Sequence, residues 1–163
     1  MRDQPDFDSD ALGGLYERPG FMLRRCIQAT GSLFEQSCRD LGITQGQYDV
    51  LHILTHLGAV DQDELARALG LDRATTGAIA RGLEQKKLIR RKVKPTDKRK
   101  RVITLTQAGE DMFKAAEPAA IEARDALFAT LSAADQKTVI DLLRKIAASA
   151  NPHIKATLKT DWA

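Results

Sequence analysis

The chain has 163 residues, of which 43% are hydrophobic and 29% charged, and its net charge is +3. This composition is that of a globular protein large enough to bury a sizeable core, and it excludes a largely disordered chain. No stretch approaches the ~20 consecutive apolar residues of a membrane-spanning helix, and residues 1–10 lack the basic and apolar regions of a secretory signal. We therefore expect a cytoplasmic protein that makes no contact with a membrane.

The charge is distributed unevenly along the chain. Residues 86–101 contain ten basic residues and one acidic residue, Asp97, so this segment carries +9 and the remainder carries −6. Such a segment can be no more than a solvated surface. A local positive excess on an acidic body nevertheless favours contact with a polyanion such as nucleic acid.

The first part of the chain is expected to be a polar arm, residues 1–17, followed by a helix within residues 18–43. Pro19 is suited to the first turn of that helix, which we predict to run to about Leu41. Apolar residues recur on two of its sides, which indicates packing against the domain core and against a second copy of the chain. Its two cysteines, Cys26 and Cys38, are separated by roughly 18 Å in such a helix, too far for a disulfide.

Residues 44–106 have the pattern of a helix-turn-helix followed by a hairpin. Thr44 with Gln47, and Asp61 with Glu64, predict two capped helix starts. Gly70 permits a sharp turn before a further helix, which we predict from Arg73 to about Lys86.

The hairpin is predicted from two alternating runs, Leu88–Val93 and Arg101–Leu105, on either side of a turn at residues 95–97. The pair Ala59–Val60 is expected to add a short third strand. A charged hairpin directly after two short helices is typical of a wing that lies along nucleic acid.

Residues 107–163 are expected to form two further helices and a tail. The first runs from Gln107 to about Leu131 and contains Pro118, which we expect to kink or break it. The second opens at Ser132. Alanine-rich faces suggest that this region pairs with a second copy, so the predicted fold is mainly α with a small β-wing: a winged helix-turn-helix flanked by N- and C-terminal dimerisation helices.

The candidate nucleic-acid contacts lie on the recognition helix and on the wing. Arginine pairs with guanine in the major groove, and threonine contacts phosphate or a thymine methyl. On the recognition helix we expect Ala74, Ile79 and Leu83 to be buried and the opposite side to face solvent. On the wing, Arg99 suits a narrow minor groove, the remaining cations suit phosphates, and Asp97 suits a brace for the turn. The predicted DNA-binding residues are Arg73, Thr75, Thr76, Arg81, Lys92, Lys94, Lys98, Arg99, Lys100 and Arg101.

Other chemistry has weaker support. His52 and His56 share one helical face, as metal ligands do, but no third ligand is evident and satisfied helix histidines are the preferred interpretation. Cys26 is a possible redox sensor, with only Arg24 and Arg25 nearby in sequence to activate it. No nucleophile, dinucleotide or phosphate-loop motif occurs, so we expect neither an enzyme nor a cofactor or metal. A protein-interaction adaptor that uses a winged helix stays open as an alternative.

Two motifs carry a family resemblance that covers residues 19–150. The first is Asp97-Lys-Arg99 followed by Val102-Ile-Thr-Leu-Thr-Gln-Ala-Gly109, and the second is Glu64-Leu-Ala-Arg-Ala-Leu-Gly70. With them the chain resembles the MarR family of transcriptional regulators. The resemblance implies a homodimer that binds a pseudo-palindromic double-stranded DNA operator, usually as a repressor released by a small molecule, with Arg99 as the minor-groove residue.

The chain departs from the family pattern in two places and resembles one subgroup in particular. Ala78 stands where a polar base-contacting residue is common, and Lys87 replaces a usual glycine. The segments Arg18–Arg25 and Thr44–Leu51 resemble members that respond to aromatic acids or their coenzyme A thioesters. An apolar cleft with one cation suits an aromatic carboxylate, and the predicted effector contacts are Arg24, Arg25, Phe34, Tyr48, His52 and Met112.

Overall fold

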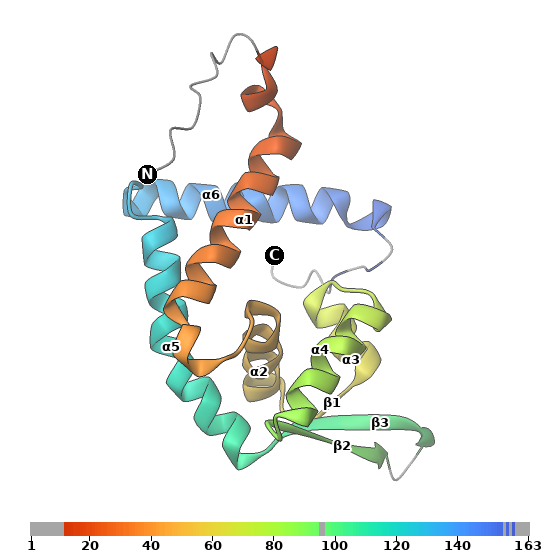
Figure 1. The fold of residues 1–163 in the computed structure, drawn as a ribbon. Coiled ribbons are helices and arrows are strands. Elements are labelled where there is room, and N and C mark those ends of the chain that lie inside the picture. Colours follow the sequence, from red (N-terminus) through yellow and green to blue (C-terminus); the bar gives the residue numbers. More distant parts are fainter. Residues whose placement is uncertain (1–11, 95–96, 155, 157, 159–163) are drawn as a thin grey trace.

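The computed structural model describes residues 12–94, 97–154, 156 and 158, with the side chains of residues 94–100 outside the description. The fold is mainly helical with one small sheet, as predicted (Figure 1). The α-helices are α1 (Pro19–Ser37), α2 (Gln45–Leu57), α3 (Gln62–Leu69), α4 (Arg73–Gln85), α5 (Gln107–Leu127) and α6 (Ala133–Ala150). The strands are β1 (Val60–Asp61), β2 (Ile89–Lys94) and β3 (Asp97–Leu105). Short 3-10 helices cover Leu15–Glu17, Arg39–Leu41 and Asn151–His153.

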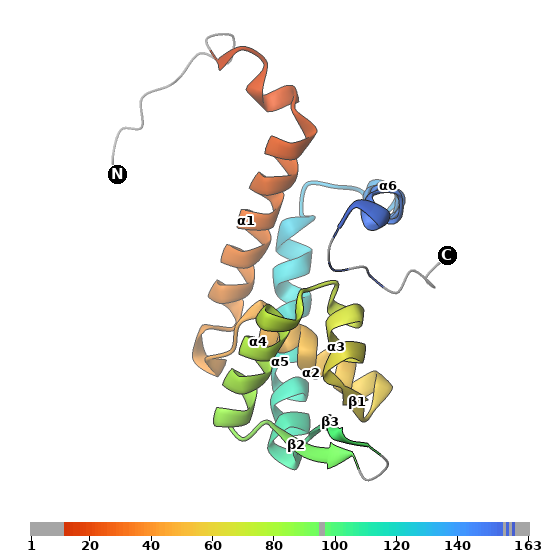
Figure 2. The same cartoon turned by 90° about the vertical axis from the view of Figure 1, so that its right-hand side faces the viewer.

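Helix α6 and most of α1 lie away from the sheet, whereas α5 begins next to β3 and runs toward α6 (Figure 1). Helices α1 and α5 pack along each other. Helix α2 packs against α5 and also contacts β3 of the sheet. Helices α3 and α4 lie beside α2, next to the sheet (Figure 1). A view turned by 90° shows α6 nearly end-on, set off from the α1–α5 pair (Figure 2).

The sheet is antiparallel, in the order β1-β3-β2. Val60 is opposite Ile103, and Ile89 is opposite Leu105, with a register shift between Val93 and Lys94. The predicted third strand is therefore confirmed, one residue later than expected. Strand β3 begins at Asp97 rather than at Arg101, so the hairpin is longer than its apolar alternation indicated.

One apolar core joins the winged region to α5. Its fully buried members come from α2, α3, α4, α5 and the sheet, and include Ala116 and the larger Val50, Leu51, Leu65, Leu83 and Ile103, all at 0% exposure. Phe113 of α5 belongs to the same core. Burying such side chains contributes roughly 1.5–3 kcal/mol each relative to leaving them exposed. The first turn of α5 is therefore fixed to the base of the wing.

Two predicted helix ends were wrong. Helix α1 ends at Ser37 because Cys38 leaves helical geometry, and Arg39–Leu41 form a 3-10 turn that Gly42 closes at φ 62°. Helix α5 ends at Leu127 rather than near Leu131. It continues through Pro118, so the expected break does not occur. Pro118 and Lys114 are both exposed, and water can therefore reach the Lys114 carbonyl that the proline leaves without its helical donor.

Lys87 has φ 60°, the left-handed geometry expected where the family usually has glycine. Its backbone N–H donates to the Glu84 carbonyl. The chain turns here from α4 into β2, so the residue sets the direction in which the wing leaves the helix-turn-helix.

Within the described residues, none of the helices has the length and apolar character needed to cross a membrane.

Candidate nucleic-acid interface and ligand cavity

The helix-turn-helix is held by capping interactions at both helix starts. Asp61 Oδ1 accepts hydrogen bonds from the N–H groups of Asp63 and Glu64, each at 2.9 Å, and Glu64 Oε2 accepts from the Asp61 N–H at 2.7 Å. Gly70 ends α3 at φ 63°. Such boxes satisfy backbone donors that a helix start otherwise leaves free, and they fix α3 relative to the turn.

The start of α4 is fixed in the same way by Asp72. Its Oδ1 accepts from the N–H groups of Ala74 and Thr75 at 2.8 and 2.9 Å, and its Oδ2 accepts from Thr75 Oγ1 at 2.7 Å. The backbone and side-chain hydrogen bonds from Thr75 lower the pKa of Asp72. The carboxylate therefore stays ionised at neutral pH and holds the first turn of α4 rigid.

The buried side of α4 differs from the prediction. Thr76, Gly77, Ala80 and Leu83 face the core, and Thr76 is at 0% exposure. The prediction that Thr76 faces solvent was wrong, and so was the expected burial of Ala74, which is exposed. The helix is rotated because its closest packing uses the small side chains at 76, 77 and 80, where α2 and α3 approach.

Three of the four residues of α4 predicted to contact DNA lie on its solvent side. Arg73, Thr75 and Arg81 are exposed, together with Ala74, Ala78 and Gln85. The exposure of Ala78 agrees with its place at a position where the family often has a base-contacting residue, whereas that of Ala74 was missed because alanine gives no polar signal. The exposed surface is therefore a shallow helix face with an arginine near each end, a shape that suits insertion into a major groove.

The hairpin projects from the sheet beyond α3 and α4 (Figure 1). Lys92 and Arg101 are exposed. The side chains of Lys94, Asp97, Lys98, Arg99 and Lys100 lie outside the described residues, so their contacts stay predictions, but the strands place these positions at the free end of the hairpin. The bracing role of Asp97 is likewise not described.

One basic residue of this segment is structural. Arg91 donates from Nε to Glu84 Oε2 at 2.8 Å and makes a second, short bond from Nη2. Its side chain is 16% exposed, and the ion pair lowers the pKa of Glu84. Arg91 therefore ties the wing to α4 instead of pointing at a ligand.

A cavity of about 170 Å³ lies between α1, α2 and α5. Phe34 and Tyr48, both predicted effector contacts, line it with ring centroids 5.6 Å apart. The rest of its lining is Thr30, Gln45, Asp49, Ala120, Ala123, Arg124 and Leu127. Two of the six residues predicted as effector contacts therefore line one cavity.

The cation of this cavity is not the one predicted. Arg124 of α5 lines the cavity, whereas the Arg24 guanidinium lies 5.1 Å from the Phe21 ring centroid and Arg25 donates to Gln28 at 3.0 Å. Neither lines the cavity, and an effector role for Arg24 and Arg25 stays a prediction. Arg124 was missed because it enters through the packing of α5 on α1, which local sequence does not reveal.

His52 and Met112 also lie outside this cavity. Met112 packs against the main core. His52 stacks on His56 with centroids 4.3 Å apart and meets Phe113 edge-on. Burial, with a smaller effect of His56, lowers the pKa of His52, and His56 Nδ1 lies 2.8 Å from the His52 carbonyl oxygen. In the part of the chain that the structure describes, no three His, Cys, Asp or Glu side chains gather in a way that could hold a metal ion.

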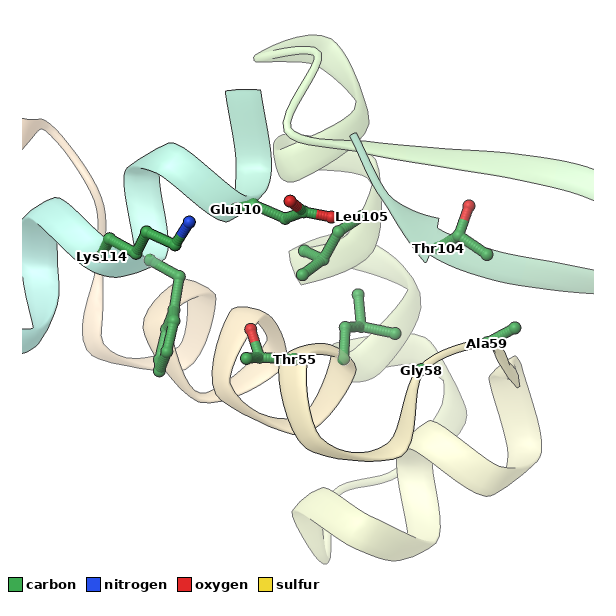
Figure 3. A pocket seen from close by; sticks show the side chains of 9 residues that line it. Thr55, Gly58, Ala59, Thr104, Leu105, Glu110 and Lys114 are labelled. Atoms are coloured by element: carbon green, nitrogen blue, oxygen red, sulfur yellow. The ribbon is translucent and has the colours of Figure 1, made fainter. Parts of the chain in front are cut away.

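A second cavity, of about 380 Å³, lies at the base of the wing (Figure 3). Thr55 and Gly58 belong to the end of α2 and the turn after it, Leu105 belongs to β3, and Glu110 and Lys114 come from α5. Like the first cavity it has charged groups of both signs, here Glu110 and Lys114, but only one aromatic residue, Phe113, lines it.

The two cysteines differ in environment. Cys26 is exposed and Cys38 is buried, and both are free thiols. Burial raises the pKa of Cys38, which makes its thiolate, the reactive form, scarcer.

The fold and the exposed surfaces define a winged helix-turn-helix protein with a recognition helix and a basic wing. A family model described as "MarR family" matches residues 43–100. The chain is 30% identical to the HTH-type transcriptional repressor NicR of Pseudomonas putida over 130 residues. This aligned segment covers 80% of this chain and 82% of NicR. The chain belongs to the MarR family of transcriptional regulators.

Solved structures agree with this assignment. The transcriptional repressor CouR bound to a 23-mer DNA duplex matches 87% of this chain and 99% of its own at 26% identity, with a TM-score of 0.79. BpsR of Bordetella bronchiseptica, whose DNA binding is regulated by 6-hydroxynicotinic acid, matches 78% of this chain and 97% of its own at 30% identity, with a TM-score of 0.74.

Proposed function

We propose that this regulator is a homodimeric repressor that binds a pseudo-palindromic operator and leaves it when an aromatic acid occupies the cavity between α1, α2 and α5. The observation that carries the proposal is the position of that cavity. It is lined by α1 and α5, the long helices outside the winged region, and by α2, which packs directly on α4. A ligand bound there touches both parts of the molecule.

The proposed dimer rests on the helices at the two ends of the chain. No residue of α6 is buried, and Leu142 and Ile146 are 52% and 53% exposed. On α1, Ile27 is 71% exposed. Apolar surface of this extent is unusual on a monomer and favours a protein partner, and self-association of α1, α5 and α6 covers it. Residues 18–43 and 107–163 are thus proposed as dimerisation segments around the DNA-binding residues 44–106.

The proposed DNA complex places α4 of each subunit in a major groove and each wing in a flanking minor groove. Two recognition helices in a symmetric dimer must match half-sites roughly 34 Å apart. A ligand that stabilises a different separation of these helices lowers operator affinity by the difference in its affinity for the two states.

The relatives support an aromatic effector. BpsR is regulated by 6-hydroxynicotinic acid, and the present cavity joins the Phe34 and Tyr48 rings to the Arg124 cation. A cavity of about 170 Å³ suits a single-ring acid. If a coenzyme A thioester binds, its nucleotide part must lie outside this cavity, because the cavity has room for the aromatic acyl group alone.

The test is binding of the full chain to genomic fragments, followed by release with a panel of aromatic acids. Fragments retained by the purified protein supply the operator, and fluorescence anisotropy then measures affinity with and without each acid. We expect at least one single-ring acid to release DNA while an aliphatic acid of equal charge does not. If no aromatic acid changes either operator affinity or thermal stability, the effector part of the proposal fails.

A further inference from the structure

The aromatic-lined cavity contains a carboxylate as well as a cation. Asp49 lies on α2, one turn after Gln45, and both line the cavity. Among the described residues, no hydrogen-bond donor and no cation pairs with the Asp49 side chain. Burial, followed by the charges of Glu117 and Asp49, raises the pKa of the neighbouring Tyr48. The Asp49 carboxylate is therefore a hydrogen-bond acceptor in the cavity wall for which the described residues supply no donor.

The environment of Asp49 destabilises its charged form as long as no donor pairs with it. Burial raises the pKa of Asp49 to about 6, because the charged form loses water without gaining a partner. Buried or half-buried carboxylates are normally paired or hydrogen-bonded. A donor brought by a ligand would replace the lost water and stabilise the charged form.

The cation belongs to another wall of the same cavity. Arg124 lies on α5 and, among the residues that the structure describes, its side chain bonds to Asp125 on its own helix, from Nε at 2.9 Å and from Nη2 at 2.7 Å. Its side chain is 61% exposed, so exchanging Asp125 for a ligand carboxylate costs little. Ala120 and Ala123 next to it are small and leave room for a flat ring.

We propose that Asp49 is the residue that determines ligand specificity, accepting a hydrogen bond from a hydroxyl or ring N–H of an aromatic monocarboxylate whose carboxylate is held by Arg124. The inference rests on the proposed function and narrows it. The effector class becomes aromatic acids that carry a donor remote from the carboxylate. A second carboxylate on the ring is excluded because it meets the like charge of Asp49.

The expected discrimination follows from the unpaired acceptor. An acid without the donor fills the same space but leaves Asp49 desolvated and unpaired. Sites built to hydrogen-bond a ligand hydroxyl strongly reject the analogue that lacks it. Because Asp49 is only half-buried, we expect a preference of roughly tenfold or more and not the extreme values of closed sites.

The experiment is isothermal titration of the full-length protein at pH 7.5 with benzoate and its three monohydroxylated forms. We expect the meta or the para isomer to bind at least about tenfold more tightly than benzoate. The ortho isomer is an internal control, because its hydroxyl bonds to its own carboxylate, and it should bind like benzoate. Equal affinity of benzoate and both the meta and para isomers overturns the inference without any variant.

Variants then assign the preference to Asp49. Asp49→Leu keeps the branched shape of the side chain, although it is larger, and removes the acceptor, so it should bring benzoate and its hydroxylated forms to within about twofold of each other. Asp49→Asn, which is closer in shape, should reduce the preference and gives a second readout if the leucine variant does not fold. Asp40→Asn, an exposed acid outside the cavity, should leave the preference unchanged. A preference that persists in a folded Asp49→Leu protein contradicts the inference.

The inference and the proposed function fail in different ways. If hydroxylated and plain acids bind equally and both release DNA, the aromatic effector stands and the role of Asp49 falls. If none of the aromatic acids binds or releases DNA, the proposed effector function falls and takes the inference with it.

Discussion

Arg73, the first residue of the recognition helix α4, donates two hydrogen bonds to the carboxylate of Asp63 in α3. The Arg73 side chain is nevertheless 74% exposed, so the pair orients the guanidinium without removing it from solvent. A surface pair of this kind contributes little to stability. Its importance is that a predicted DNA contact is already held in a fixed position in the free protein.

Arg73→Ala should therefore weaken operator binding by roughly tenfold while leaving the melting temperature within about 2 °C of the wild type. Anisotropy titration and thermal unfolding measure the two effects separately. Asp63→Asn removes the partner but keeps the arginine, so it should weaken DNA binding less than Arg73→Ala does. If Arg73→Ala binds the operator as tightly as wild type, α4 does not contact DNA through its first residue.

Gly109 in the first turn of α5 should tolerate no side chain. A Cβ atom there would lie 2.0 Å from the Leu88 carbonyl oxygen, which belongs to backbone and cannot swing aside. We expect Gly109→Ala to lower the free energy of unfolding by about 3 kcal/mol or more.

Gly31→Ala is the matched control for Gly109→Ala. It lies within α1, where an added Cβ meets no atom within 4 Å, and it should stabilise the protein by up to about 1 kcal/mol. Urea unfolding compares the two variants. A Gly109→Ala protein as stable as wild type would show that α5 does not approach the Leu88 backbone as described.

Asp49 should make the protein less stable as the pH rises. Its pKa is raised by burial from an ordinary 3.8 to about 6, so between these values the folded state binds more protons than the unfolded state. Stability therefore falls from about pH 4 to pH 6 and stays lower above it. Allowing for residual solvent exposure, the loss is about 1–2 kcal/mol.

The comparison with Asp49→Asn isolates this effect from other titrating groups. The variant should be more stable than wild type at pH 7.5, and the advantage should decline toward zero at pH 4. Chemical unfolding at three pH values measures it. An advantage that is independent of pH would mean that Asp49 has an ordinary pKa in the folded protein.

The sequence predicted the features of this fold that depend on local chemistry. The caps at Thr44, Asp61 and Asp72 fixed three helix starts, because each uses side chains within three residues of the helix. Turn residues and alternation predicted the hairpin, and Lys87, which stands where the family usually has glycine, has left-handed geometry.

The features that sequence missed depend on contacts between distant segments. The buried side of α4 was misplaced because Ala74, Thr76 and Ala78 are all small and give almost no hydrophobic periodicity. Arg124 and Asp49 meet in one cavity only through the packing of α5 against α1 and α2. Nothing within a few residues of either marks them as neighbours.

The basic wing is expected to bind DNA through Arg99, and Arg99→Ala tests this most directly. Arg99 is predicted to enter the minor groove, so its loss should weaken operator binding by roughly tenfold or more at fixed salt. Thermal stability and the dimer should be unchanged, because position 99 lies near the free end of the hairpin. Lys137→Ala, which removes an exposed cation from α6 far from the wing, should leave operator affinity unaltered. If the Arg99→Ala protein binds the operator with wild-type affinity in salt-matched anisotropy titrations, the account of the wing is contradicted.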